Sequence, residues 1–166
     1  MYNILNTIQT TLLPIEPIEW EQQHEWPYTE IGKRITTDHV LDVGSGCGLL
    51  GIFLVYYNYC KTVTLYEVDD CRLLYARDLV NLLNLNDKIT IHDAMYTGNE
   101  QLSNTTISST RFGSLVEFEK LIGNNKAITI RRTEEVEPLF NRFSTRVWKG
   151  EIIQRSDGFE LEVLTR

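Results

Sequence analysis

The 166-residue sequence predicts an α/β fold, in which a mostly parallel sheet of seven strands carries helices on both faces and ends in an antiparallel hairpin. Short β-branched or apolar runs alternate along the chain with segments that have helical spacing of apolar residues. This alternation favours parallel strands, because each helix carries the chain back to the start of the next strand. Near the end of the chain, Asp157-Gly158 separates two β-like runs and is typical of a hairpin turn.

The first part of the chain divides into an arm and the start of a single domain over residues 28–166. Residues 1–27 contain three of the four prolines, which break long helices, and we interpret them as an N-terminal arm. Pro27 favours a helix over Tyr28–Ile35, since proline is well tolerated at a helix start. The pattern then predicts strands at Val40–Val43, Thr62–Val68 and Lys88–His92, and helices at Leu49–Tyr59 and Asp70–Leu85.

The second part of the chain continues the same alternation. A strand rich in threonine, isoleucine and serine is expected first, and the glutamates that begin the last predicted helix suit the dipole of a helix N-terminus. The predicted elements are strands at Thr105–Thr110, Lys126–Arg131, Arg146–Ile153 and Phe159–Leu164, with helices at Ser114–Leu121 and Glu134–Phe143.

Composition excludes several classes of protein. No run approaches the roughly 18 apolar residues that span a membrane, and the N-terminus has no secretory signal, so we expect a cytoplasmic protein. Cys47, Cys60 and Cys71 are odd in number and lack metal-ligand spacing, which favours reduced structural thiols. The three histidines are isolated, and we expect no metal site.

Charge is distributed unevenly along the chain, whose formal net charge is −7. Residues 1–109 carry 6 basic and 14 acidic side chains, a balance of −8, whereas residues 110–166 carry 10 basic and 9 acidic ones, a balance of +1. An acidic chain is a poor general binder of nucleic acid, because neutralisation of phosphates drives that binding. A basic face in the last third is compatible with these numbers.

The most informative stretch is Val40-Leu41-Asp42-Val43-Gly44-Ser45-Gly46-Cys47-Gly48, a predicted strand that runs into a glycine loop and then a helix. The dinucleotide fingerprint is G-x-G-x-x-G, but here the third glycine is residue 48, not 49. Asp42 precedes the first glycine by two residues and would repel a pyrophosphate. The loop therefore favours a ligand with an ammonium or sulfonium group, and no Gly-Lys-Ser/Thr follows to indicate a P-loop.

Carboxylates also follow the next two predicted strands. Glu67 ends the second strand 23 residues after Gly44, where a carboxylate can accept both hydroxyls of a ribose. Asp69 is the alternative ribose ligand, or the N-cap of the next helix. Asp93 follows the third strand. Because the carboxyl ends of parallel strands meet at one edge of a sheet, these groups should share one ligand site.

The sequence V-L-D-V-G-S-G-C-G resembles the first motif of the class I, Rossmann-like, S-adenosylmethionine (SAM)-dependent methyltransferases. The resemblance covers roughly residues 26–166 and implies that SAM is the cofactor. It implies that the loop wraps the methionine part of SAM, that Glu67 binds the ribose, that Val68 packs on the adenine, and that Asp93 and Ala94 contact the adenine amino group. The implied SAM-binding residues are Asp42, Gly44, Ser45, Gly46, Gly48, Glu67, Val68, Asp93 and Ala94.

Two segments bear on the methyl acceptor. The fourth predicted strand lacks the acidic or Asn-Pro-Pro-Tyr motif of many family members, which counts against common adenine, cytosine and lysine methylation. Instead, Thr110-Arg111-Phe112-Gly113-Ser114-Leu115 and Gly48-Leu49-Leu50-Gly51-Ile52 resemble motifs of bacterial small-subunit ribosomal RNA guanine-N7 methyltransferases, the first being one residue shorter. The resemblance implies RNA as acceptor, with Arg111 at a phosphate or guanine edge and Ser109 in the pocket.

Three hypotheses follow for function. The first is a methyltransferase for RNA at guanine N7, which needs no general base because N7 has a free lone pair. The second is a methyltransferase for a small molecule or a protein, which the acidic balance permits. The third is a SAM-binding partner or regulatory protein without transferase activity.

Two arginines, Arg131 and Arg132, end the fifth predicted strand. They either bind phosphate or face solvent beside Glu134 and Glu135.

Overall fold

The computed structural model describes residues 28–97 with their side chains and the backbone of four further segments, residues 105–108, 126–132, 149–153 and 159–165. The predictions made for the arm at 1–27, the helices at 114–121 and 134–143, and the turn at 157–158 lie outside these residues.

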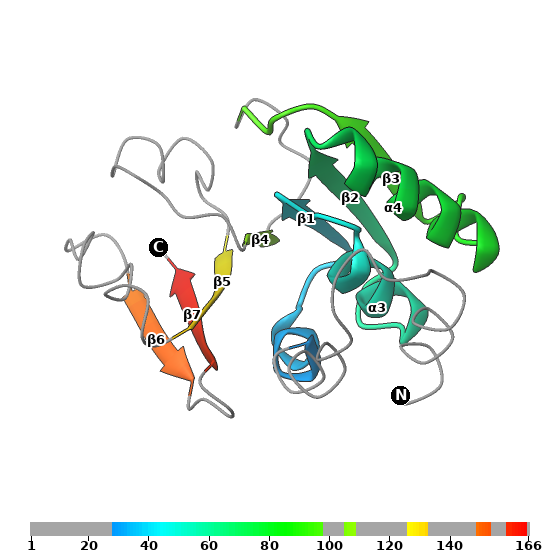
Figure 1. Ribbon diagram of the computed structural model, residues 1–166. Helices are drawn as coiled ribbons and strands as arrows, with labels where there is room; N and C mark the ends of the chain where they lie inside the picture. Colours follow the sequence, from blue (N-terminus) through cyan, green and yellow to red (C-terminus); the bar gives the residue numbers. More distant parts are fainter. Residues whose placement is uncertain (1–27, 98–104, 109–125, 133–148, 154–158, 166) are drawn as a thin grey trace.

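The strands form one sheet in the order β3-β2-β1-β4-β5-β7-β6 (Figure 1). Strands β1 to β5 run parallel, whereas β7 is antiparallel to both β5 and β6. The predicted α/β class, with a parallel sheet and helices, is thereby confirmed. The strands are β1 His39–Val43, β2 Thr62–Glu67, β3 Ile89–Asp93, β4 Thr105–Ser108, β5 Lys126–Arg132, β6 Lys149–Ile153 and β7 Phe159–Thr165.

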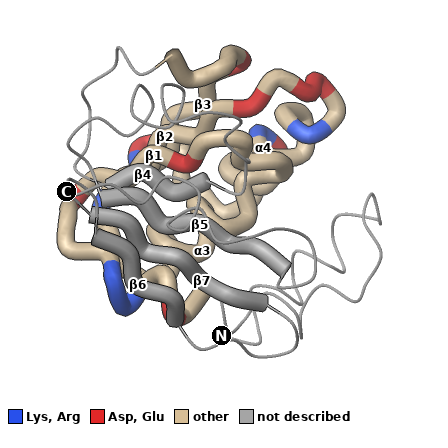
Figure 2. Tube along the Cα trace, turned by 90° about the vertical axis from the view of Figure 1, so that its left-hand side faces the viewer, with Lys and Arg blue, Asp and Glu red and all other residues tan. Residues whose placement is uncertain are grey.

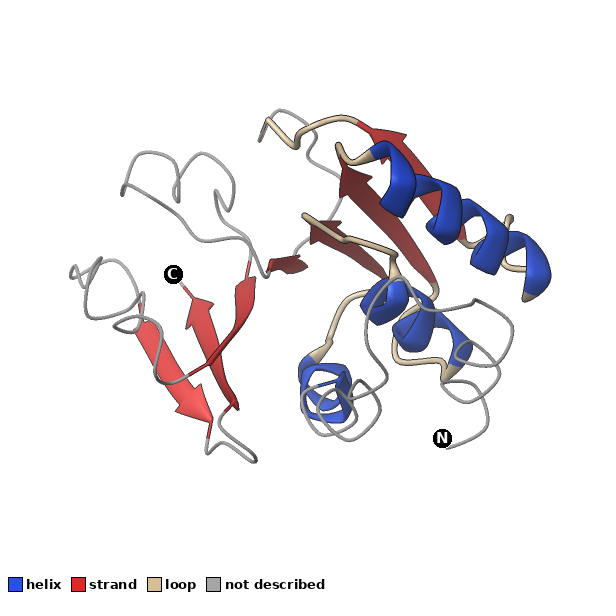
Figure 3. Cartoon of the chain, viewed as in Figure 1, coloured by secondary structure: helices blue, strands red, loops and turns tan. Residues whose placement is uncertain are grey.

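Helices occupy residues 28–34, α3 (Leu49–Tyr56) and α4 (Asp70–Leu82), drawn in blue in Figure 3. All three were predicted, but α3 and α4 each end three residues earlier than expected. Asn58 and Asn84 follow the two helices with left-handed φ angles of 59° and 55°. This conformation suits asparagine better than most residues and stops helix propagation.

Hydrogen bonds at the two helix ends explain why these asparagines terminate the helices. The Tyr59 amide donates to the Leu54 carbonyl at 2.8 Å, and the Leu85 amide donates to the Val80 carbonyl at 2.9 Å. Each bond spans the left-handed asparagine and satisfies a carbonyl that the helix leaves unpaired, as in a Schellman motif. The hydrophobic spacing continues past these asparagines, so periodicity alone overestimated both helices.

The described helices cover one face of the sheet. Buried strand residues on this face, such as Val40, Val63 and Leu65, belong to the same apolar cluster as Ile31 and Phe53 of the helices. The intervening strand residues form a second buried cluster on the opposite face, because successive side chains of a strand alternate. That second cluster consists of Leu41, Val43, Tyr66 and Tyr96.

Aromatic packing fixes the helix at 28–34 against α3. Tyr28 is buried, and its ring centroid lies 5.5 Å from that of Phe53, which in turn lies 5.8 Å from the ring of Tyr59. Tyr28 is therefore a core residue. Trp26, two residues before it, lies outside the described residues.

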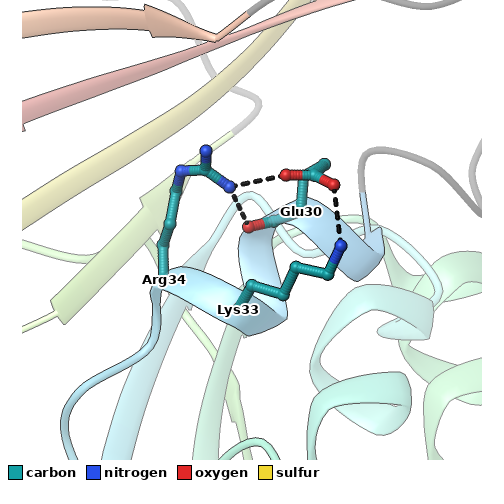
Figure 4. Close-up of polar contacts among 3 residues, drawn as sticks. All are labelled: Glu30, Lys33 and Arg34. Carbon is teal, nitrogen blue, oxygen red and sulfur yellow. Dashed lines mark hydrogen bonds and ion pairs between the residues drawn. The ribbon is translucent and has the colours of Figure 1, made fainter.

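Ion pairs on the outer side of the same helix join Glu30 to Lys33 at 3.1 Å and to Arg34 at 2.7 Å (Figure 4). The hydrogen bond from Arg34 is the main cause that lowers the pKa of Glu30, although partial burial opposes it. Pairs at these spacings stabilise a helix by roughly 0.2–0.5 kcal/mol each.

None of the helices in the described part of the chain has the length and apolar character needed to cross a membrane.

Replacing Gly51 by alanine should destabilise the protein, although alanine is the better helix former by about 1 kcal/mol. A Cβ at Gly51 would lie 2.5 Å from Leu65 Cδ2 and 2.9 Å from Val63 Cγ1, and both side chains are fully buried. We expect a net loss of about 1–3 kcal/mol in the free energy of unfolding, measured by urea titration. Asn81→Ala, on the exposed side of α4, is the control and should change stability little. A Gly51→Ala variant as stable as the control would contradict this packing.

Candidate functional site

A glycine loop joins the carboxyl end of β1 to the start of α3. Gly44, Gly46 and Gly48 have φ angles of 69°, 58° and 77°, in the left-handed region that favours glycine. Gly48 is restricted a second time, because a Cβ there would lie 2.7 Å from Leu65 Cδ1. The loop conformation thus depends on the glycines that the sequence motif contains.

The amides of this loop are hydrogen-bonded within the protein itself. Gly44 and Ser45 both donate to the Tyr66 carbonyl, at 2.9 and 3.0 Å, and Gly46 donates to Glu67 Oε2 at 2.8 Å. Gly48 donates to the Ser45 carbonyl at 2.9 Å. A loop that cradles phosphate needs its N–H groups free to point at the anion. These bonds therefore count against a nucleotide phosphate in this loop.

Asp42 lies beneath the first turn of α3, with its side chain 4% exposed. Burial is the main cause that raises the pKa of Asp42 to about 7; a hydrogen bond from the Gly51 backbone opposes the shift, and the charge of Glu67 adds to it. Within the described residues, Asp42 Oδ2 and the buried Ser45 Oγ have no hydrogen-bond partner. Burying polar atoms unpaired costs about 1–3 kcal/mol each, so each of these atoms is a candidate to bond a ligand group.

Glu67 is partly exposed at the end of β2 and organises the neighbouring backbone. Besides the bond from Gly46, its Oε1 accepts from the amides of Val68 and Asp69 at 2.8 and 3.0 Å. A carboxylate has about four acceptor positions, so capacity remains for a ligand hydroxyl. The side chain of Asp69, by contrast, accepts from the Arg72 amide at 3.0 Å and caps α4. Of the two interpretations of Asp69, the helix cap is the one observed.

The end of β3 completes this edge of the sheet. Asp93 is the register partner of Glu67, and Asp93 and Ala94 are both exposed. Two apolar side chains stand beside them without burial: Val68 is 58% exposed and Met95 is 73% exposed. The arrangement thus combines carboxylates with accessible apolar surface, and Figure 2 marks the acidic residues of the described chain in red.

The structure brings most of the predicted site residues to one edge and leaves two undescribed. Asp42, the loop glycines with Ser45, Glu67 with Val68, and Asp93 with Ala94 all lie at or next to the carboxyl ends of β1, β2 and β3. Ser109 and Arg111, the candidates on the acceptor side, lie outside the described residues. No group of three or more His, Cys, Asp or Glu side chains that could hold a metal ion occurs in the part of the chain searched.

Three contributions to the site were not predicted from the sequence. Gly51 supplies the backbone bond to Asp42, and Tyr66 supplies the carbonyl that anchors the loop. A Cβ placed on Gly46 would lie 3.6 Å from Arg72 Nη1, so the Arg72 guanidinium lies over the loop. Backbone partners leave no trace in residue type. For Arg72, the one available signal was its place in the first turn after β2.

Comparison with known proteins finds similar structures but no similar sequence family. No protein-family model and no curated protein matches this sequence. TrmK of M. capricolum, solved with S-adenosyl-homocysteine, superposes with a TM-score of 0.63 and 16% identity over 84% of this chain and 67% of that one. Ribosomal protein L11 methylase of Lactobacillus delbrueckii subsp. bulgaricus superposes with a TM-score of 0.67 and 12% identity over 86% of this chain and 78% of that one. An rRNA methylase of Streptococcus thermophilus superposes with a TM-score of 0.63 and 12% identity over 93% of this chain and 99% of that one. The chain therefore has the Rossmann-like fold of class I SAM-dependent methyltransferases.

The Asp42 carboxyl should make stability depend on pH. Its folded-state pKa of about 7 lies above the ordinary value of 3.8, so the native state holds this proton more tightly than the unfolded chain. The resulting stabilisation is complete below the unfolded-state pKa and is lost as pH rises through the folded-state pKa, an effect on the order of 4 kcal/mol.

Urea titrations across this pH window provide the measurement. We expect Asp42→Asn to remove this fall in stability, whereas Asp70→Asn, at an exposed position, should leave it unchanged. Equal pH profiles for wild type and Asp42→Asn would show that the carboxyl is not buried in solution.

Proposed function

We propose that this chain binds SAM at the carboxyl edge of β1, β2 and β3 and transfers its methyl group to an acceptor. One observation carries the proposal: a buried carboxyl, Asp42, has an oxygen without a hydrogen-bond partner among the described residues, and it lies next to a glycine loop whose amides at Gly44, Ser45, Gly46 and Gly48 are already hydrogen-bonded. Such a site offers acceptors to a cation, and these loop amides are not available to an anion. The likeness to structures of methyltransferases supports the same choice.

In this proposal each acidic group has a separate part of SAM to hold. Asp42 and Ser45 receive the ammonium of the methionine part, beside the close backbone approach that Gly44, Gly46 and Gly48 permit. Glu67 accepts from the ribose hydroxyls. Asp93 and Ala94 contact the adenine amino group, and Val68 packs on the ring, since Val68 is exposed at the end of β2.

Bound SAM supplies an electrophilic methyl group on a sulfonium, and transfer of that group is an in-line displacement. The chain's own residues then hold the donor in one orientation and exclude water around it, which is the source of most of the rate in such a reaction. The bond from Gly46 to Glu67 links the loop to the proposed ribose ligand, so that both sides of the cofactor are positioned together.

We propose RNA as the acceptor, with guanine N7 as the reactive atom, Arg111 at a phosphate or base edge, and Ser109 in the pocket. The resemblance of residues 110–115 to guanine-N7 methyltransferases supports this choice, as does an rRNA methylase among the structures of similar fold. A protein acceptor is the alternative, and the likeness to a ribosomal protein methylase favours it.

We also propose the architecture of the whole domain and that the protein acts in the cytoplasm. The domain is taken to be a seven-stranded Rossmann-like sheet whose last hairpin turns at Asp157-Gly158, with helices on both faces. Cys47, Cys60 and Cys71 form no disulfide in the described part of the chain, which suits the proposed action in the reducing cytoplasm.

Removing either central carboxylate should weaken SAM binding. Asp42→Ala and Glu67→Ala each remove a charge-assisted hydrogen bond, worth about 1.5–3 kcal/mol, so we expect the dissociation constant measured by calorimetry to rise at least tenfold or so in each. Asp70→Ala removes the same charge from an exposed position of α4 and serves as the control. Unchanged affinity in both site variants would show that these residues are misassigned.

SAM affinity should also rise with pH as Asp42 ionises. A cationic ligand binds the carboxylate form, so below the pKa of about 7 the proton of Asp42 must leave on binding. The affinity of wild type should then rise by up to about tenfold per pH unit below that pKa and level off above it. Calorimetry on Asp42→Asn should give a weaker and nearly flat profile. A wild-type profile as flat as that of the variant would show that Asp42 does not bind the ligand.

Transfer of a labelled methyl group from SAM to total RNA, total protein and small-molecule extracts decides between the functions. Label in RNA that is released as 7-methylguanine is the expected result. Label in protein or in small molecules alone would replace RNA as the acceptor. Tight binding of SAM without transfer to any pool would favour a SAM-binding partner or regulatory protein.

A further inference from the structure

A positive charge lies beside the glycine loop. Arg72 belongs to the first turn of α4, and a Cβ placed on Gly46 would lie 3.6 Å from Arg72 Nη1. The Gly46 amide donates to Glu67 Oε2 at 2.8 Å, so Gly46 has a carboxylate on its amide and a guanidinium next to its Cα. Arg72 therefore brings hydrogen-bond donors to an edge of the sheet where carboxylates gather.

The other lysines and arginines of residues 28–97 are paired or lie elsewhere. The two in the helix at 28–34 form ion pairs with Glu30. Two lysines directly precede β2 and β3, at the amino ends of these parallel strands and thus at the opposite edge of the sheet. The second arginine of α4 lies more than one helical turn beyond Arg72. These residues are Lys33, Arg34, Lys61, Lys88 and Arg77.

The proposed ligand has an anionic group as well as a cationic one. In the methionine part of SAM, the carboxylate and the ammonium are attached to the same carbon, so the two groups must bind close together. The ammonium is proposed to lie at Asp42 and Ser45. Ser45 directly precedes Gly46, and consecutive Cα atoms are about 3.8 Å apart. A donor that lies at Gly46 is therefore within reach of the carboxylate.

The carboxylate of the ligand needs a positive partner at this edge. The loop amides at residues 44, 45, 46 and 48 are already hydrogen-bonded within the protein. The Ser45 hydroxyl can donate one hydrogen bond but carries no charge. Asp42, Glu67 and Asp93 would repel a second anion. A guanidinium offers both a charge and paired donors whose geometry matches a carboxylate.

We infer that Arg72 binds the carboxylate of the methionine part of SAM and makes the site selective for a cofactor with an intact amino acid. Arg72 is exposed, so its long side chain can adjust to the ligand without disturbing the core. The inference rests on the proposed function, because it concerns the ligand of the same site. It adds a basis for specificity, since adenosyl thioethers that lack the carboxylate lose this bond.

Calorimetry with two compounds tests the inference. S-adenosylhomocysteine has the carboxylate, whereas its decarboxylated form, adenosyl-3-thiopropylamine, keeps the ammonium alone. Wild type should bind the decarboxylated form about tenfold more weakly, at the lower end for a charge-assisted bond because Arg72 is exposed. Arg72→Gln should weaken binding of S-adenosylhomocysteine about tenfold and leave binding of the decarboxylated form within about twofold of wild type.

Three further variants make the comparison specific. Arg72→Lys keeps the charge but not the paired donors, so it should recover part of the lost affinity. Arg77→Gln removes the same charge from an exposed position of the same helix, and it should alter the affinity for either compound by less than about twofold. Asp42→Ala should weaken binding of both compounds, because both carry the ammonium.

The pattern across the two compounds keeps the proposals apart. Arg72→Gln that binds S-adenosylhomocysteine like Arg77→Gln would overturn the inference alone. Equal losses for both compounds would also overturn it, because Arg72 would then shape the loop and not hold the carboxylate. Binding of the decarboxylated form at the wild-type level shows that Arg72→Gln is folded. Failure of wild type to bind S-adenosylhomocysteine would refute the proposed function, and this inference with it.

Discussion

The hydrogen bonds that tie the glycine loop to β2 are the constraint on which the rest of the site depends. The Tyr66 carbonyl and the Glu67 carboxylate accept from three consecutive loop amides, so the loop has a fixed shape before any ligand arrives. Many Rossmann-like loops offer free amides to phosphate. Here those three amides are used internally, and the carboxyl groups of Asp42 and Glu67 lie beside the loop as acceptors, with the Arg72 guanidinium near Gly46. This arrangement supports the proposal that the loop binds a cationic ligand.

This arrangement has an energetic cost that the fold offsets by packing. Asp42 is buried beneath α3, where an ionised carboxyl loses its hydration, and Gly51 provides one backbone donor in return. The close approach of α3 to Val63 and Leu65 is possible only because residue 51 lacks a side chain. A ligand that brings a positive charge to Asp42 would lower this cost. Part of the binding free energy of such a ligand would therefore come from pairing a buried carboxyl.

The sequence was most informative where residue type and conformation are linked. The left-handed loop of Gly44, Gly46 and Gly48 and the carboxylates at the ends of β1, β2 and β3 could be predicted, because glycine readily adopts a positive φ and few other residue types supply a carboxylate. Both helix ends were placed too late, because Asn58 and Asn84 stop the helices through backbone conformation while the apolar spacing continues. The contributions of Tyr66 and Gly51 act through backbone atoms, which no residue pattern reports.

The carboxylates of Asp42, Glu67 and Asp93 gather at the carboxyl ends of β1, β2 and β3, and the proposed SAM site depends on that arrangement. A crystal structure with S-adenosylhomocysteine tests the central claim most directly. The account predicts the ammonium within hydrogen-bond distance of Asp42 or Ser45, and the ribose hydroxyls on Glu67. A loop that stays empty in such crystals, or that holds a phosphate against its amides, would contradict it.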